Sequence, residues 1–414
     1  MKISFSPPDI SEKEIEYVSE ALRSGWITTG PRVKLLEDRL SEYLGTKKTA
    51  CLNSQTACAE MALRLLGIGP GDEVITCAYT YTASASVIDH VGASIKLVDC
   101  QKDSLEMDYD ALAAAITENT KAVIPVDLAG IPCDYDRIFQ ILETKKEMFV
   151  PREGEDLPAH LQKALGRVAV LADGAHALGA SYKGQNVGTI ADFTAFSFHA
   201  VKNLTTGEGG CLSWKDFNDV DDEEIYHQIQ LYSLHGQSKD AFTKNKPGAW
   251  EYDVEGLWYK CNMTDIMGAI GLAQLERYPE LLKKRKMIIE KYDAAFKPLG
   301  IEVLPHYTEE HISSGHLYLT RIPFGQIQKE RSGDQRRNEI ITKMAEAGIA
   351  CNVHYKPLPL LSAYQKLGFD IADYPNAYQH YAKEITLPLH TRLTEEETDY
   401  IVEQFIKITR DYIS

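Results

Sequence analysis

Short apolar runs recur along the first half of this chain, and each is separated from the next by a segment with helical periodicity. The runs cover residues 73–78, 94–100, 122–128, 168–173, 192–198 and 210–214. Runs of this length that alternate with helices are typical of parallel strands buried on both faces and joined by crossover helices. The pattern predicts an α/β fold, a three-layer sandwich around a mostly parallel central sheet.

The pattern changes near residue 255. From Asn262 the sequence predicts a long amphipathic helix, which includes the basic run 283–286. Such a run is most often a solvated helical face, with phosphate binding as the alternative. A chain of 414 residues also favours two domains over one core. We therefore predict a large domain over residues 1–255, with an N-terminal segment that reaches the active site, and a smaller α+β domain over residues 256–414.

Helix-start signals mark three further positions. Ser11 and Glu14 form a capping-box pattern, and an apolar face that includes Ile15 and Leu22 follows. Thr394 begins a similar pattern near the end of the chain. Residues 238–250 are polar and rich in lysine, glycine and proline, which predicts a long loop.

Charge and composition limit the partners. A net charge of -16 would repel a nucleic-acid backbone or an anionic membrane surface. The sequence has no apolar stretch of about eighteen residues, and its start lacks the apolar core of a signal peptide, so we expect a cytoplasmic protein. The eight cysteines contain no C-x-x-C pair and read as reduced core residues, and we predict no metal site.

Two ionisable residues follow strands of the predicted sheet. Asp173 ends the run 168–173, and Lys202 lies just beyond the run 192–198, where a glycine-rich loop begins. The carboxyl ends of parallel strands are where open α/β sheets bind ligands. A lysine at such an apolar rim loses solvation, which lowers its pKa and frees its amine as a nucleophile or Schiff-base partner. A lysine placed like Lys202 is more often a solvated charge, and an aspartate placed like Asp173 is more often a helix or turn cap. The inference therefore rests on the two residues together.

An acid and a lysine so placed are what pyridoxal phosphate (PLP) needs from a protein. The lysine bonds to the cofactor's aldehyde, and the carboxylate keeps the pyridine nitrogen protonated so that the ring can withdraw electrons. A phosphate cradle is also needed, and Ser54, Gln55 and Thr56 stand between a short strand and a helical pattern. Ser54 suits the N-cap, and a helix N-terminus offers free N–H groups to phosphate. Because ordinary N-caps far outnumber phosphate sites, the helix start at Ser54 supports the PLP hypothesis but is not sufficient evidence for it.

With these elements in place, the chain resembles the DegT/DnrJ/EryC1/StrS sugar aminotransferases, which are PLP enzymes of fold type I, the aspartate aminotransferase-like fold. The resemblance covers nearly the whole chain. It rests on seven ordered blocks at residues 24–31, 67–75, 78–84, 173–176, 196–210, 259–266 and 354–358.

The resemblance implies roles for the residues of the cofactor site. Lys202 would carry the cofactor covalently and shuttle protons, Asp173 would face the pyridine nitrogen, and His176 would lie beside the ring. Tyr81 matches an aromatic residue that stacks on the ring face, although by type alone it would more often be a core tyrosine. Ser197 matches the serine that completes the phosphate cradle.

The family also builds each site from two subunits, which implies a homodimer with shared active sites. Lys260 and Asn262 match the partner segment that lies over the cofactor phosphate. The positions around the sugar site are matched by Trp26, Thr29, His354 and Tyr355.

The chain departs from the family pattern in several places. Gln55 stands where a small residue is usual, so its side chain must turn away if its backbone N–H is to reach phosphate. Ala172 replaces a glutamate that commonly precedes the pyridine-binding acid, and residues 257–261 replace a more usual Pro-Gly-Tyr-Lys-Tyr. Residues 143–167 look like an insertion.

The resemblance implies an aminotransferase that moves an amino group from an amino acid, with glutamate expected, to a nucleotide-linked keto-sugar for amino-sugar or polysaccharide biosynthesis. An aminocyclitol or aromatic-amine synthase of the same fold would use a substrate without a nucleotide. A cofactor-binding regulator without turnover is a further alternative, against which the intact Asp173 and Lys202 pair speaks. The family's 3-dehydratases carry histidine at the position of Lys202, which disfavours that branch.

Overall fold

A seven-stranded sheet forms the centre of the computed structural model, which describes residues 1–239, 250–325 and 331–413. The strand order is β1-β9-β8-β5-β4-β2-β3. All neighbours from β8 to β3 are parallel, and β9 is antiparallel to both β1 and β8. The strands are β1 (Thr49–Leu52), β2 (Glu73–Cys77), β3 (Ser94–Val98), β4 (Thr120–Ile124), β5 (Ala169–Asp173), β8 (Phe193–Ser197) and β9 (Gly210–Trp214). The prediction of a mostly parallel central sheet is confirmed.

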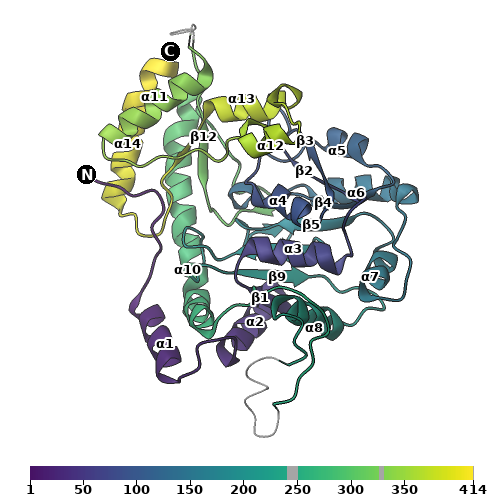
Figure 1. Ribbon diagram of the computed structural model, residues 1–414. Coiled ribbons are helices and arrows are strands. Elements are labelled where there is room, and N and C mark those ends of the chain that lie inside the picture. Colours follow the sequence, from purple (N-terminus) through teal and green to yellow (C-terminus); the bar gives the residue numbers. More distant parts are fainter. Residues whose placement is uncertain (240–249, 326–330, 414) are drawn as a thin grey trace.

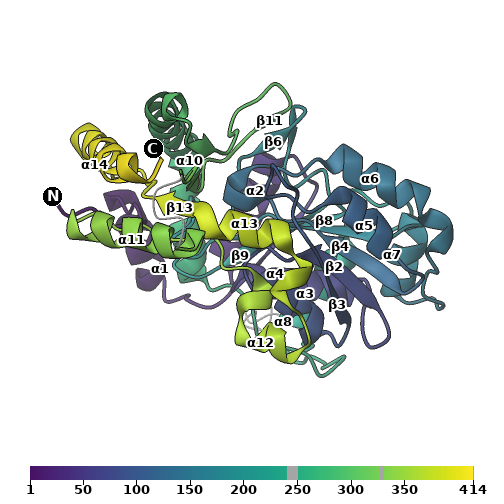
Figure 2. The same cartoon turned by 90° about the horizontal axis from the view of Figure 1, so that it is seen from above.

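Helices cover both faces of this sheet. One core cluster joins the sheet to α3, α4, α7 and α8, and a second joins its other face to α5 and α6. The helices of this domain are α1 (Glu12–Arg23), α2 (Pro31–Leu44), α3 (Gln55–Leu65), α4 (Ala83–His90), α5 (Tyr109–Ala115), α6 (Tyr135–Thr144), α7 (Leu157–Leu165) and α8 (Asp222–Ser233). The result is the three-layer sandwich that the alternating pattern predicts (Figures 1 and 2).

One long helix, α10 (Asp265–Phe296), connects this sandwich to a smaller body of structure. Leu272 and Tyr278 of α10 share a core with α2, whereas Ile289 and Phe296 share a core with the second body (Figure 1). The predicted division at residue 255 assigns the whole helix to the small domain, and it stays a prediction. Viewed from above, α11 and α14 lie at the left end of the molecule, with α10 beside them, and α5, α6 and α7 lie at the right end (Figure 2).

The second body contains the sheet β10-β12-β13. Its elements are β10 (Glu302–Val303), β12 (Tyr318–Arg321), α11 (Gly333–Glu346), α12 (Ser362–Lys366), α13 (Pro375–Lys383), β13 (Glu384–Leu387) and α14 (Glu395–Ile413). A third sheet pairs β6 (Ser181–Tyr182) with β7 (Gln185–Asn186) and β11 (His311–Ile312). The 3-10 turns are η1 (Leu128–Gly130), η2 (Lys146–Met148), η3 (Lys297–Leu299), η4 (Leu358–Leu360) and η5 (Ile371–Asp373).

The predicted helix starts agree with the structure, but two predicted surfaces do not. Ser11 caps α1 in a full capping box, and Thr394 accepts the N–H of Glu397 at the start of α14. The apolar face predicted for α1 is only partly buried, because Ala21 is buried but Ile15 is 52% exposed and Leu22 is 54% exposed on a helix at the edge of the molecule (Figure 1). The basic run is not wholly solvated either, since Arg285 is buried and donates to the carbonyls of residues 315, 316 and 389.

The expected insertion extends the core of the large domain. Its helix α7 contributes Leu157 and Leu161 to the core around α3, and Gln162 donates its side-chain amide to the carbonyl of Leu66 at 2.6 Å. Residues 240–249 of the expected loop 238–250 lie outside the described residues. All eight cysteines are free thiols, and seven of them are buried. In the described part of the chain, helices are either too short or too polar to cross a membrane.

Candidate active site

A cavity of about 500 Å³ opens at the carboxyl ends of β5 and β8. A small recess shares part of its wall, and both Asp173 and Lys202 line this recess. The strands place these residues together because Asp173 is the last residue of β5 and Lys202 lies in the loop after β8. Of the predicted site residues, those that line the cavity or recess are Ser54, Gln55, Thr56, Tyr81, Asp173, His176, Ser197, Lys202, His354 and Tyr355.

Asp173 is a buried carboxyl group, only 5% exposed. Its Oδ2 accepts the hydroxyl of Ser84 at 2.6 Å, and its Oδ1 accepts the N–H of Ala175 at 3.1 Å. Burial raises the pKa of Asp173, while the two hydrogen bonds and the nearby charge of Lys202 oppose that rise. Buried without an ion pair at bonding distance, this carboxyl group can stabilise a cation brought next to it.

The amine of Lys202 is set for nucleophilic chemistry. Burial lowers the pKa of Lys202 to about 8, and the negative charge of Asp173 works against that shift. A far larger share of this amine is therefore neutral near pH 8 than of an ordinary solvated lysine. Because only the neutral amine attacks a carbonyl, the local environment favours covalent bonding to an aldehyde.

The N-terminus of α3 forms another part of the cavity wall. Ser54 is its N-cap and accepts the N–H of Ala57 at 3.1 Å. Gln55 and Thr56 line the cavity at the first helical positions, where backbone N–H groups have no intrahelical partner. Gly210 lets the backbone of β9 pass close to the N-terminus of α3, because a Cβ at this position would lie 2.5 Å from the backbone nitrogen of Gln55.

The residues present fit the predicted cofactor. The side-chain nitrogen of Gln55 is buried and has no hydrogen-bond partner among the described residues, at a wall where a phosphate would supply acceptors. Ser197 lines the same cavity. The helix N-terminus, the buried acid and the partly neutral lysine are the three groups that PLP requires.

Aromatic rings form the opposite side of the recess. The rings of His176 and Tyr355 are stacked at 6.2 Å, and Tyr81, 58% exposed, lies 5.8 Å from Tyr355. Nδ1 of His176 lies 3.2 Å from the N–H of Ala129, so it accepts that hydrogen. Nε2 then carries the ring hydrogen and faces the hydroxyl of Tyr355 at 3.2 Å. Burial, with the charges of Lys202 and His354, lowers the pKa of His176 well below its usual range, so this ring is neutral.

Sequence reasoning missed several cavity residues. His316 lines the cavity, lies 4.4 Å from the ring of His176, and has its Nδ1 2.9 Å from Asn203. Phe5 and Ser6 line it from the N-terminal segment. The N-terminal segment is expected to reach the active site, but that expectation does not single out Phe5 or Ser6. No periodic pattern or motif surrounds His316, so only the folded chain reveals it. Ser84, the partner of Asp173, lies in the recognised block 78–84, but the block does not say what Ser84 contacts.

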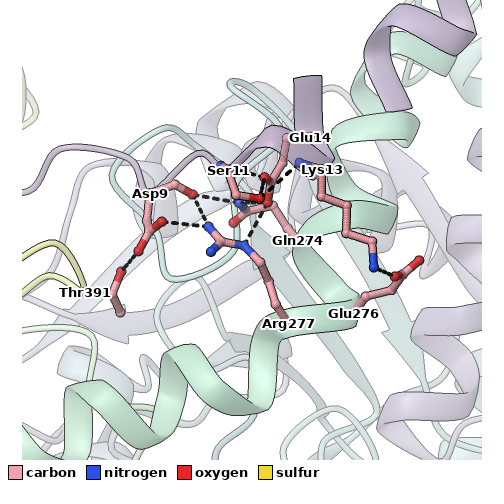
Figure 3. A network of polar contacts seen from close by, with 8 residues as sticks. All are labelled: Asp9, Ser11, Lys13, Glu14, Gln274, Glu276, Arg277 and Thr391. Carbon is pink, nitrogen blue, oxygen red and sulfur yellow. Dashed lines mark hydrogen bonds and ion pairs between the residues drawn. The ribbon is translucent and has the colours of Figure 1, made fainter. Parts of the chain in front are cut away.

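A polar network holds the N-terminal segment in place. Asp9 accepts from Arg277 at 2.7 Å and from Thr391 at 2.5 Å, and Arg277 also donates to Glu14 at 2.9 Å (Figure 3). The network joins the segment to α1, to α10 and to the chain that precedes α14. Four residues before Asp9, Phe5 is thereby fixed at the cavity wall.

The remaining predicted site residues gather elsewhere. Asn262 donates to the hydroxyl of Thr29 at 2.5 Å, Trp26 donates to the carbonyl of Thr29 at 3.1 Å, and Lys260 contacts Asn262. None of the four is among the described residues that line the cavity of their own chain. We call Trp26, Thr29, Lys260 and Asn262 the outer patch.

Comparison with known proteins identifies relatives over nearly the whole chain. The sequence pattern of the DegT/DnrJ/EryC1/StrS aminotransferase family matches residues 8–150 and 161–406. The unmatched residues 151–160 lie inside the expected insertion 143–167. The spore coat polysaccharide biosynthesis protein SpsC of Bacillus subtilis is 36% identical over 403 residues, which are 97% of this chain and 95% of SpsC.

Solved structures of related proteins share the fold and the cofactor. The candidate sugar aminotransferase Spr1654 from Streptococcus pneumoniae, in its PMP-form, is 56% identical with a TM-score of 0.93, over 99% of this chain and 100% of the other. Its PLP-form is 55% identical with a TM-score of 0.92, over 99% of both chains. PseC from Helicobacter pylori, an aminotransferase involved in the biosynthesis of pseudoaminic acid, is 28% identical with a TM-score of 0.83 over both full chains.

Proposed function

The chain belongs to the DegT/DnrJ/EryC1/StrS aminotransferase family and is a PLP-dependent aminotransferase, and we propose that it transfers an amino group from L-glutamate to the keto group of a nucleotide-linked sugar. The observation that carries this proposal is the pairing of Asp173 with Lys202 in one recess, beside the open N-terminus of α3. The product would be an amino-sugar for polysaccharide biosynthesis, the process in the name of SpsC. Because the chain belongs to an aminotransferase family, a regulator without turnover is not needed to explain the residues of this site.

The cavity offers a place for each part of the cofactor. Lys202 would hold it covalently, Asp173 would face its ring nitrogen, and His176 and Tyr81 would lie against its ring. Ser54, Gln55, Thr56 and Ser197 would receive its phosphate. When bound, PLP supplies an electron-withdrawing ring that makes the α-hydrogen of an amino acid acidic.

Lys202 then acts as an acid and a base. Its neutral Nζ would take the proton from the Cα of the amino acid, and the resulting ammonium would pass that proton to C4′ of the cofactor, so that the amino group leaves the amino acid. With the keto-sugar the transfer would run in reverse, from C4′ to the carbon that gains the amine. Because burial lowers the pKa of Lys202 to about 8, the amine can both take up and release a proton near neutral pH. Asp173, supported by Ser84, supplies the fixed negative charge that stabilises a positive ring nitrogen. The exchange converts the amino acid into its 2-oxo acid and the keto group into an amine.

The sugar would enter along the wall that carries Phe5, His354 and Tyr355. The described residues that line the cavity include no arginine, and Lys202 is the one lysine among them. A nucleotide diphosphate needs more positive charge than this wall provides. A second copy of the chain, placed with its outer patch at the cavity, would bring Lys260 to the anion.

A shared site therefore follows as part of the proposal. Lys260 and Asn262 contact each other on the surface, beside the end of β1, where Asn53 donates to the carbonyl of Cys261 at 2.8 Å. Burial lowers the pKa of Lys260, although its amine stays accessible. We propose a homodimer in which the outer patch of each chain completes the cavity of the other.

The proposal is tested by the two half-reactions, followed by the absorbance of bound cofactor. Purified protein loaded with PLP should convert to the amine form when L-glutamate is added. A panel of nucleotide-linked keto-sugars should then restore the PLP form, whereas the matching free sugars should not. Restoration by free aminocyclitol or aromatic ketones alone would support the synthase alternative. Absence of conversion by any amino acid would refute the proposal.

A further inference from the structure

A buried glutamate lies behind the cavity wall of the small domain. Glu384, the first residue of β13, is fully buried, and its Oε2 accepts the backbone N–H of His354 at 2.9 Å. The hydroxyl of Thr386 lies within hydrogen-bond distance of Oε1 of Glu384 and 2.9 Å from Nδ1 of His354. His354 in turn lines the cavity, with Phe5 stacked on its ring at 5.5 Å. A continuous chain of polar atoms thus joins Glu384 to the cavity.

This chain admits two proton arrangements in which every hydrogen bond is made. If Glu384 is ionised, Thr386 donates to the carboxylate and accepts from Nδ1–H of His354, which leaves Nε2 as a bare acceptor. If Glu384 is protonated at Oε1, it donates to Thr386, and Thr386 donates to Nδ1. The ring hydrogen of His354 then sits on Nε2. The proton on Glu384 therefore decides which ring nitrogen of His354 carries the hydrogen.

The surroundings of Glu384 favour the protonated arrangement. The positive charge of Arg337 opposes this arrangement, but its guanidinium Nη1 donates to the backbone carbonyl oxygens of Tyr381 and Glu384. Arg321, the strand neighbour on β12, pairs with Glu302 instead. The other titratable groups around the carboxyl group are Tyr79, Cys351, His354 and Tyr355. Burial raises the pKa of Glu384 to about 8, so the carboxyl group is largely neutral at pH 7.

We propose that Glu384 is a positioning residue, which acts through the hydroxyl of Thr386 so that His354 presents an Nε2–H donor to an oxygen of the sugar substrate. The inference rests on the proposed function for the identity of the substrate, but the relay itself is a property of the unliganded chain. A neutral donor suits this place, because burial and the charge of Lys202 lower the pKa of His354 to about 3 and keep its ring uncharged. A donor at Nδ1 fixes the ring hydrogen of His354 on Nε2.

The tautomer of His354 tests the relay without turnover. Protein labelled with ¹⁵N-histidine should show His354, identified by loss of its signals in His354→Gln, with hydrogen on Nε2 at pH 7. Between pH 7 and pH 9, the wild-type signals should shift toward the Nδ1–H form as Glu384 loses its proton. In Glu384→Gln the amide donates permanently to Thr386, so the Nε2–H form should persist to pH 9. An Nδ1–H ring in wild type at pH 7, or the same pH response in both proteins, would overturn the proposal.

Kinetics test the consequence for the substrate. Thr386→Val should lower kcat/KM for the keto-sugar about tenfold, the size expected for loss of one positioned hydrogen bond, and should leave the glutamate half-reaction within about twofold. Thr386→Ser keeps the hydroxyl and should restore activity. The matched control is Thr320→Val, which removes a buried hydroxyl bonded to the carbonyl of Ile385 on the neighbouring strand. Equal losses in Thr386→Val and Thr320→Val would contradict a positioning role.

The two experiments separate the inference from the proposed function. If the tautomer follows Glu384 but no nucleotide-linked sugar reacts, the relay stands and the proposed substrate fails. If the sugar reacts and Thr386→Val reacts equally well, the proposed function stands and the relay has no role in it.

Discussion

The two walls of the cavity use opposite electrostatic designs. The large-domain wall sets a carboxyl group, Asp173, against an amine, Lys202, at one edge of the central sheet. The small-domain wall presents His316 and His354, and burial keeps both rings neutral by lowering the pKa of each. The first wall can move protons and stabilise charge, whereas the second can donate and accept hydrogen bonds without changing charge. The difference fits the proposal that the wall with Asp173 and Lys202 carries the chemistry and that the wall with His316 and His354 recognises the sugar.

The largest effect concerns whether one chain contains a complete site. Lys202→Ala and a double variant, Lys260→Ala with Asn262→Ala, should each lose activity by at least about a thousandfold, because each lacks a group that no other residue replaces. After subunit exchange, the mixture should regain up to about a quarter of wild-type activity, since half the dimers contain one good site. Activity assays before and after exchange measure this.

The control mixes Lys202→Ala with Asp173→Asn. Both changes damage the same wall, so no hybrid dimer contains an intact site and no activity should return. Full activity of the double variant, or absence of recovery after proven exchange, would show that the outer patch does not serve a neighbouring site.

The charge on the large-domain wall should matter most in the proton-transfer step. Asp173→Asn should still bind cofactor but should slow the glutamate half-reaction at least about a hundredfold, the lower range for loss of a positioned charge. Ser84→Ala removes the hydrogen bond at 2.6 Å to Asp173, together with the contact at 2.8 Å to the hydroxyl of Thr80, and should cost about tenfold or less. Stopped-flow absorbance measures both rates. A near-normal rate in Asp173→Asn would show that the carboxylate of Asp173 is not needed for proton transfer.

The burial of Lys202 predicts a pH dependence of cofactor attachment. Its pKa lies at about 8, and its neutral form prevails above that value. The rate of covalent bonding between apoprotein and PLP should therefore rise about tenfold per pH unit below pH 8 and level off above it. A rate that keeps rising to pH 10 would mean that Lys202 is solvated, and the contrast between the two walls would fail.

The smallest effect tests the small-domain wall. Phe5→Ala removes the ring stacked on His354 and should raise KM for the keto-sugar about threefold to tenfold, as expected for one aromatic pair. The glutamate half-reaction should stay unchanged. Ile10→Ala, an exposed position on the same segment, is the matched control. A slower glutamate half-reaction in Phe5→Ala would show that the N-terminal segment takes part in the chemistry. That result would contradict the contrast between the two walls.

The two walls also differ in how far the sequence predicts them. Asp173 and Lys202 follow buried strands, and because parallel strands end at one edge, their order in the sequence already implies that they meet. Ser54 was predictable as an N-cap from its place before a helical pattern. The six apolar runs each contain or overlap a strand, since burial leaves a strong local signal, although the edge strand β3 is partly exposed.

The small-domain wall left no such signal. His354 is expected at the site only from the family resemblance. It meets Phe5 of the N-terminal segment, His316 and Glu384 through long-range packing alone. Glu384 reads as an ordinary charge until the fold shows that it is fully buried. The prediction for α1 was incomplete for a related reason. Periodicity shows that a helix has an apolar face, but it does not show which part of the protein covers that face.

Reductive trapping with borohydride tests the central claim most directly. PLP-loaded protein reduced with borohydride, digested and mapped by mass spectrometry should carry one pyridoxyl group on Lys202, within the peptide 200–207. Addition of L-glutamate before borohydride should abolish the label, because transfer of the amino group releases Lys202. A label on another lysine would contradict the site that Asp173 and Lys202 define. Persistence of the label after glutamate treatment would contradict the amino-group transfer assigned to it.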